Sequence, residues 1–331
     1  MKSIFLRKFK INYKSAFSLI ELSIVILIVS ILITGALAVS VSKMNSMKVE
    51  AAQKRIDTIY KALGLYLTTN GNGRLPCPAS MLTIKTNSSN YGESSGAAGT
   101  CSSSGVYIST VNTNLVYGMV PVKDLGLGTD FAEDGFGNKL SYVVDKRFTS
   151  SSTFGLSASN SGLMTVKEIT SAGSDQVNTT GAIFLIISHG ANKSGAFNAN
   201  SESQNTRSYD ADEMSNDLDS ITTPAFDATF VKSTKRSNVF DDTIFYKTRN
   251  ALVTDFNALS LIPCEASGIN NNDVTYGATT MTWPSSSYGK IVSANETCPT
   301  GYTGSVKKPT KKCGAYGVWE VGAIRSCAEN G

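Results

Sequence analysis

The sequence has few of the residues that build a metal cluster or a nucleic-acid interface. It contains a single histidine, His189, and no CxxC pair, which argues against a zinc site made of cysteines. Positive charge is concentrated at one end: residues 1–16 carry five bases and no acid, and the remaining 25 bases face 26 acids. Such a balanced body lacks the basic surface needed to bind phosphates, so we predict no nucleic-acid partner.

Charge is also scarce in one long stretch near the N-terminus. Residues 17–41 form a mostly apolar run, and a helix needs about 20 residues to span a bilayer. The bases before it predict that residues 1–16 lie in the cytoplasm and that the body lies outside. One acid, Glu21, interrupts the run. A carboxylate in hydrocarbon is costly unless it is paired or neutralised, so this residue needs a partner.

The residues around this acid, AFSLIELSIVILIVSIL, closely resemble the N-terminus of type IV pilins and of type II secretion pseudopilins. The resemblance implies that a prepilin peptidase cuts between Ala16 and Phe17 and methylates the new amine, giving N-methylphenylalanine. It also implies that Glu21 pairs with a neighbouring subunit when a filament is assembled on an inner-membrane platform. The family more often has Gly before the cut, and Ala16 is a tolerated departure. The alternative is a plain signal anchor whose glutamate reaches the membrane interface.

Apolar residues continue beyond this run at three- and four-residue steps, which indicates an amphipathic helix. The predicted helix covers 17–70, with a membrane-spanning half at 17–41, and NGNG at 70–73 ends it. The residues expected to face the core are Val49, Ala52, Ile56, Ile59, Leu63 and Leu67.

The segments after the helix predict an α+β fold, in which the long helix packs on a small antiparallel sheet. Strand-like segments are LVYGMVPV, KLSYVV and GAIFLIIS, and DDTIFYKTRNALVTDFNALSLI is a strand that runs into a helix. The stretch 149–180 is polar and loop-like, with one short candidate strand, GLMTVKEI. The predicted domains are a leader at 1–16, the helix at 17–70, a head at 71–262 and a small all-β module at 263–331.

Part of the head is similar to the C-terminal half of major pseudopilins. The similar segments are DGFGNKLSYVV, FLIISHGANKSGAFN and YDADE. In those relatives this region binds calcium, and by position its ligands fall on Asn192, Asp210 and Asp212. Asn192 stands where the relatives have aspartate, which removes a charge that calcium favours. The alternative is a solvated acidic loop, and Ca²⁺ is the one cofactor suggested.

The six cysteines predict disulfides, because their number is even and they follow an export signal. A bond between Cys77 and Cys101 would close a loop of the head. The last four cysteines are separated by 33, 14 and 13 residues, and spacing alone permits three pairings.

The segments TCPTGYTG and KKCGAYGVWEVGAIRSC resemble the complement-control (sushi) module. The resemblance implies disulfides Cys264–Cys313 and Cys298–Cys327, with Trp319 in the core. The alternative is an unrelated disulfide knot. Either way, a β module of this size needs disulfides because its core is small.

These features predict a minor pilin or pseudopilin, a structural subunit of a type IV pilus or a type II secretion pseudopilus. It would be anchored in a bacterial inner membrane, with its body in the periplasm before assembly into a filament. The bulky module at 263–331 favours a tip or surface position. The alternative is a pilus-borne adhesin whose module binds a surface protein or a glycan. We predict no enzyme activity, because no nucleophile–base pair is recognisable and His189, beside a buried strand, is expected to be structural.

Overall fold

The computed structural model describes residues 18–327, with gaps at 71–72, 87, 151–160, 171–174, 234–236, 238, 267–273, 303–307 and 323–324. Ala16 and Phe17, the residues of the predicted cleavage site, lie outside the described residues. The chain divides into two compact units, residues 1–47 and residues 48–331.

The described part of the first unit is the first portion of helix α1 (Leu19–Leu65). Its large apolar side chains are exposed along the helix: Leu19, Ile20, Leu22, Ile24, Val25, Ile26, Leu27, Ile28, Val29, Ile31, Leu32 and Ile33. Among the residues described, no helix meets both the length and the apolarity required to cross a membrane. The span expected at 17–41 therefore stays a prediction.

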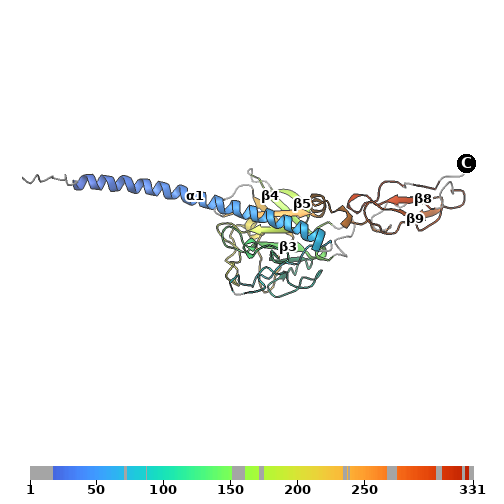
Figure 1. Cartoon of the computed structure of the whole chain (residues 1–331), viewed down its shortest axis with the longest axis horizontal. Coiled ribbons are helices and arrows are strands. Elements are labelled where there is room, and N and C mark those ends of the chain that lie inside the picture. Colours follow the sequence, from blue (N-terminus) through green and yellow to red (C-terminus); the bar gives the residue numbers. More distant parts are fainter. Residues whose placement is uncertain are drawn as a thin grey trace, which may run out of the picture. The chain divides into compact units, whose positions relative to one another are not determined.

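The second unit contains the amphipathic end of α1, which lies along the sheet in Figure 1. Five of the residues expected to face the core are buried, and Val49 is half-buried. A short π-helical turn, Tyr66–Asn70, follows α1, so helical structure ends at the residue where the sequence predicted it. Periodicity alone therefore identified the buried face and the end of this helix.

A sheet of seven strands forms the body of the second unit in the described part of the chain (Figure 1). The strands are β1 (Tyr107–Ile108), β2 (Leu115–Met119), β3 (Ser141–Asp145), β4 (Met164–Ile169), β5 (Asp175–Ser188), β6 (Thr229–Ser233) and β7 (Thr243–Thr248). They are hydrogen-bonded in the order β1-β2-β3-β5-β4-β6, and β7 pairs with β5. Neighbouring strands are antiparallel except β4 and β6, which are parallel, so the predicted all-antiparallel sheet is wrong for this pair.

Strand β5 is longer than the sequence predicted. It begins at Asp175, inside the stretch expected to be a loop, and its first residues pair with β4. The side chains from Asp175 to Asn178 are exposed, so this half of the strand has no apolar alternation to reveal it. The other half, from Ala182 to Ser188, is buried between β3 and β7.

Two short helices connect the strands: α3 (Ala211–Met214) and α4 (Arg249–Asp255). Helix α4 follows β7 directly, as the sequence predicted, because the Thr248 hydroxyl accepts the N–H of Ala251 and caps the helix. Side chains of this region also contact α1. The Tyr60 hydroxyl donates to Asp255 Oδ2 at 2.5 Å, and the ring of Phe256 packs on the backbone of Gly64.

The C-terminal part of the second unit has a separate small core. It contains two hairpins, β8 (Val274–Tyr276) with β9 (Thr279–Met281), and β10 (Ile291–Ser293) with β11 (Thr310–Lys312). The buried cluster consists of Cys264, Met281, Trp283, Ala294, Cys313, Trp319 and Cys327. Disulfides join Cys264 to Cys313 and Cys298 to Cys327, and a third joins Cys77 to Cys101 in the head. Trp319 is buried in this core, as expected.

Candidate functional site

Glu21 caps the first turn of α1. Its Oε2 accepts the backbone N–H of Ser18 at 3.0 Å, while the Ser18 hydroxyl accepts the N–H of Ile20 at 3.3 Å. This reciprocal arrangement is a capping box, which satisfies N–H groups that a helix start leaves without partners. The sequence analysis missed this role, although the pattern Ser-x-x-Glu is its ordinary signature.

The three residues suggested as calcium ligands have different roles in the head. The Asp210 carboxylate caps α3 by accepting the N–H groups of Asp212 and Glu213, each at 3.0 Å. Asn192 donates its side-chain amide to Glu213 Oε1 at 2.6 Å and to the Val239 carbonyl at 3.1 Å. In the described residues, neither Asp210 nor Asp212 belongs to a group of converging metal-ligand atoms. Calcium binding by these three residues stays a prediction.

A buried polar cluster forms instead where β5 ends and β7 begins. Ser188 at the end of β5 is paired with Thr243 at the start of β7, so the adjacent residues His189 and Asp242 meet at one edge of the sheet. Asp217, which follows α3, reaches the same point. The Nδ1 atom of His189 lies 3.4 Å from Asp217 Oδ1 and 3.8 Å from Asp242 Oδ1, and all three side chains are fully buried.

The cluster is held in place by hydrogen bonds on its outer side. The Nε2 atom of His189 lies 3.0 Å from the Ser141 hydroxyl and 3.2 Å from the Tyr117 hydroxyl. Asp242 Oδ2 accepts the Asn216 amide at 2.9 Å. These neighbours lie on β2, β3 and the segment after α3, so distant parts of the chain fix the imidazole and the carboxylate.

The pKa of His189 and the pKa of Asp242 are both raised. In each case, burial and the charge of the partner side chain act in opposite directions. Burial alone would lower the pKa of His189, but contact with Asp217 and the charge of Asp242 raise this pKa to about 9. Burial raises the pKa of Asp242 to about 8, although His189 and Asn216 favour its charged form. The cluster therefore favours holding positive charge at its centre.

The Ser141 hydroxyl and the Asp217 carboxylate lie on opposite sides of the His189 imidazole. This spatial arrangement is that of a serine hydrolase triad, in which a histidine activates a hydroxyl. A catalytic serine must reach a substrate, yet Ser141 and His189 are fully buried in the sheet. The hydroxyl also accepts a hydrogen bond from Tyr117 at 2.7 Å. The arrangement therefore suits a structural or ligand-holding role. Sequence reasoning found His189 but not its partners, because Asp217 and Asp242 come close only in the folded chain.

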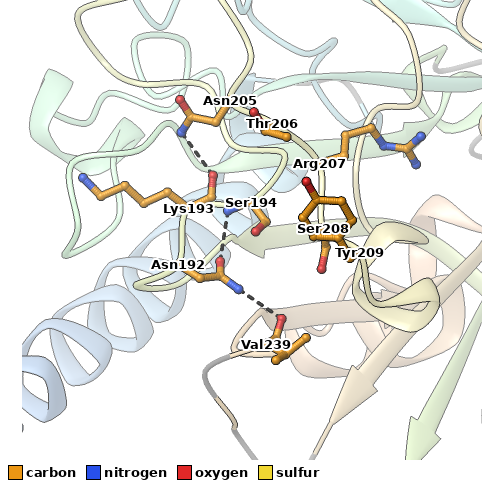
Figure 2. A pocket seen from close by; sticks show the side chains of 9 residues that line it. All are labelled: Asn192, Lys193, Ser194, Asn205, Thr206, Arg207, Ser208, Tyr209 and Val239. Carbon is orange, nitrogen blue, oxygen red and sulfur yellow. Dashed lines mark hydrogen bonds between the residues drawn. The ribbon is translucent and has the colours of Figure 1, made fainter.

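A surface pocket of about 550 Å³ lies over the loop that follows His189. Figure 2 shows Asn205 donating to the Lys193 carbonyl and Asn192 donating to the Val239 carbonyl, so much of the wall is fixed by internal hydrogen bonds. Tyr209, which also lines the pocket, is 98% exposed.

Comparison with known families matches residues 11–37 to the prokaryotic N-terminal methylation motif. No curated protein and no solved structure matches the chain. The motif indicates a type IV pilin-like or pseudopilin-like precursor, which a peptidase processes and which assembles with other pilin subunits. The sushi resemblance of the C-terminal module has no support from these comparisons and stays a prediction.

Proposed function

We propose that this protein is a minor pilin or pseudopilin, a non-enzymatic subunit of a type IV pilus or a type II secretion pseudopilus. The methylation motif at residues 11–37 is the observation that carries the proposal, because it contains the cleavage junction and Glu21 in one segment. In this proposal residues 17–41 anchor the precursor in the inner membrane, with the leader in the cytoplasm. A prepilin peptidase cuts before Phe17 and methylates it.

Assembly then rests on a charge pair. The cut creates a positive amine at Phe17 in an apolar layer, where neither this amine nor the Glu21 carboxylate is favourable alone. Pairing between neighbouring subunits relieves both and sets the axial position of each subunit. The exposed apolar side chains from Leu19 to Ile33 would pack against other such helices in the filament.

Mass spectrometry of the mature protein tests the first step. We expect an N-terminus at Phe17 that carries one methyl group. An Ala16→Gly variant should be processed at least as fast, since glycine is the usual residue before the cut. A mature protein that still begins at Met1, or one cut within the apolar run, would refute the proposal.

A second candidate function is adhesion by the C-terminal module. Apolar side chains on this module are exposed, among them Ile291, Val318 and Val321, the last at 94%. Such residues can bind a surface protein or the apolar face of a glycan. Deleting 263–331 separates the two functions: loss of attachment with normal filament number favours the adhesin, and loss of filaments favours a role in assembly or initiation.

A further inference from the structure

The buried cluster of His189, Asp217 and Asp242 presents three ligand atoms to one point. One ligand atom from each residue lies within 4.8 Å of the others, and His189 Nδ1 lies 3.4 Å from Asp217 Oδ1 and 3.8 Å from Asp242 Oδ1. Each of these atoms is buried and has no hydrogen-bond partner among the residues described. Buried polar atoms without partners are unfavourable, so a group that binds all three would stabilise the fold.

The spacing fits a small divalent metal ion. Zinc binds imidazole nitrogen and carboxylate oxygen at about 2.0–2.2 Å, so neighbouring ligands of a tetrahedral site lie about 3.4 Å apart. The separations from His189 Nδ1 are 3.4 Å to Asp217 and 3.8 Å to Asp242. A hydrogen bond between nitrogen and oxygen would be shorter, usually about 2.9 Å. The observed geometry therefore suits a shared metal better than a shared proton.

Each candidate ligand is also oriented by its other polar atom. His189 Nε2 faces the hydroxyls of Ser141 and Tyr117, and Asp242 Oδ2 accepts the Asn216 amide. Asp217 Oδ2 accepts the N–H of Ser208 at 3.4 Å. Metal sites in proteins commonly hold their ligands in this way, with an outer hydrogen bond that fixes the imidazole or the carboxylate.

Glu213 lies beside this site, near Asp242, but is not one of its converging ligands. Its Oε2 is buried without a hydrogen-bond partner in the described chain, while its Oε1 accepts the Asn192 amide. Glu213, Asp241 and Asp242 form a second group whose ligand atoms lie within 4.8 Å of one another, and neither His189 nor Asp217 belongs to it. A metal on His189, Asp217 and Asp242 would therefore have three protein ligands, and a water molecule would complete a tetrahedral site.

The charges near the cluster and a neighbouring pocket agree with a cation. Of the described lysine and arginine side chains, only Arg207 comes within 4.0 Å of Asp217, Asp242 or Glu213. With the imidazole of His189 neutral, as a metal ligand must be, the carboxylates of Asp217 and Asp242 would have little positive charge near them, and a bound cation would balance them. A surface pocket of about 220 Å³, lined by Arg207, Met214 and Asp217 among others, borders one of the three candidate ligands.

We propose that His189, Asp217 and Asp242 bind a divalent transition-metal ion that stabilises the fold, of which Zn²⁺ fits best. Imidazole favours such ions over Ca²⁺, which takes oxygen ligands. The ion would tie the loop after β5 to the start of β7. This inference does not depend on the proposed pilin function.

Metal loading of the full chain tests the proposal. The protein, in detergent and without a histidine tag, is stripped with a chelator, exposed to Zn²⁺ and freed of unbound metal. Elemental analysis should find one zinc per chain, and the melting temperature should rise. Co²⁺ loading should give the visible absorption bands of tetrahedral coordination. A folded wild-type chain that retains no zinc, or from which excess Ca²⁺ removes the ion, would overturn the proposal.

Variants assign the ligands. Asp242→Asn and His189→Gln keep side-chain size and should reduce bound zinc to near zero. Because both changes alter a buried site, near-ultraviolet circular dichroism must first show a folded head. Ser141→Ala, which removes only a supporting hydrogen bond, should weaken zinc binding about 10- to 100-fold. Asp212→Asn is the matched control, an acid close by in sequence but outside both ligand groups, and should bind zinc normally. Equal zinc content in Asp242→Asn and wild type would refute the assignment.

Discussion

The backbone N–H of Ser18 donates to Glu21 Oε2 at 3.0 Å, so the acid in the apolar run is also the cap of α1. The two roles draw on different properties of Glu21. Capping needs an acceptor oxygen, whereas pairing with a subunit amine needs a negative charge. Variants that keep one property and remove the other can therefore separate them.

Glu21→Gln keeps an acceptor for the Ser18 N–H but carries no charge, while Glu21→Ala has neither. We expect both variants to be processed and both to enter filaments at least tenfold less than wild type, because the charge is missing. Immunoblots of sheared filaments measure this. Ser18→Ala, which keeps the charge and removes the hydroxyl acceptor, should assemble nearly normally. Normal assembly of the Gln variant together with failure of Ser18→Ala would instead assign the role to the helix cap.

Local patterns predicted the parts of the fold that depend on neighbouring residues. The period of Ile56, Ile59 and Leu63 identified the buried face of α1, because helical side chains three or four residues apart share a face. The parallel pairing of β4 with β6 was missed, because it joins segments that are distant in sequence. The partners of His189 were missed for the same reason. The capping box at Ser18 was readable from sequence alone and was overlooked.

Gly64 lies in α1 where the ring of Phe256 leaves no room for a side chain. An added Cβ would lie 2.1 Å from a ring carbon, far closer than van der Waals contact. Gly64→Ala gains about 1 kcal/mol of helix propensity but forces the ring to move, at a cost of roughly 1–3 kcal/mol. We expect net destabilisation in denaturant unfolding. In a Phe256→Ala background the same change should become neutral or stabilising, and stabilisation in both backgrounds would contradict the contact.

Lys139 should make stability rise with pH. It is fully buried, and its ammonium donates to the carbonyls of Met81 at 2.6 Å and Ser201 at 2.8 Å. Burial lowers the pKa of Lys139 to about 8, although Glu202 and Glu133 oppose this. The unfolded chain, with a lysine pKa near 10.4, then binds more protons than the folded chain between about pH 8 and 10.4.

Relative to Lys139→Met, the wild-type free energy of unfolding should therefore increase by up to about 3 kcal/mol across this range. Urea unfolding of both proteins from pH 7 to 10.5 measures the difference, and other titrating groups cancel because both chains contain them. If the free energies of unfolding of wild type and Lys139→Met changed in parallel with pH, the Lys139 ammonium would not be destabilised in the folded head.

The C-terminal module should depend on its disulfides more than the head does. Three of the seven residues in its buried cluster are cysteines, whereas the head has a much larger apolar core. The Cys264–Cys313 bond spans 49 residues, and such a crosslink contributes roughly 4 kcal/mol by restricting the unfolded chain. Replacing both cysteines by alanine should unfold the module at moderate temperature and leave the head folded.

Tryptophan fluorescence can follow this event separately from the head. The chain contains two tryptophans, Trp283 and Trp319, and both are buried in the module core at 1% exposure. In the double variant their emission should shift to the red at 25 °C, while circular dichroism of the head still melts cooperatively at higher temperature. The corresponding change at Cys77 and Cys101 is the control, and should lower the melting temperature of the head without moving the emission. If the emission of the Cys264/Cys313 variant did not shift, both tryptophan rings would still be buried without that disulfide. Packing alone would then hold the module core together, contrary to the prediction.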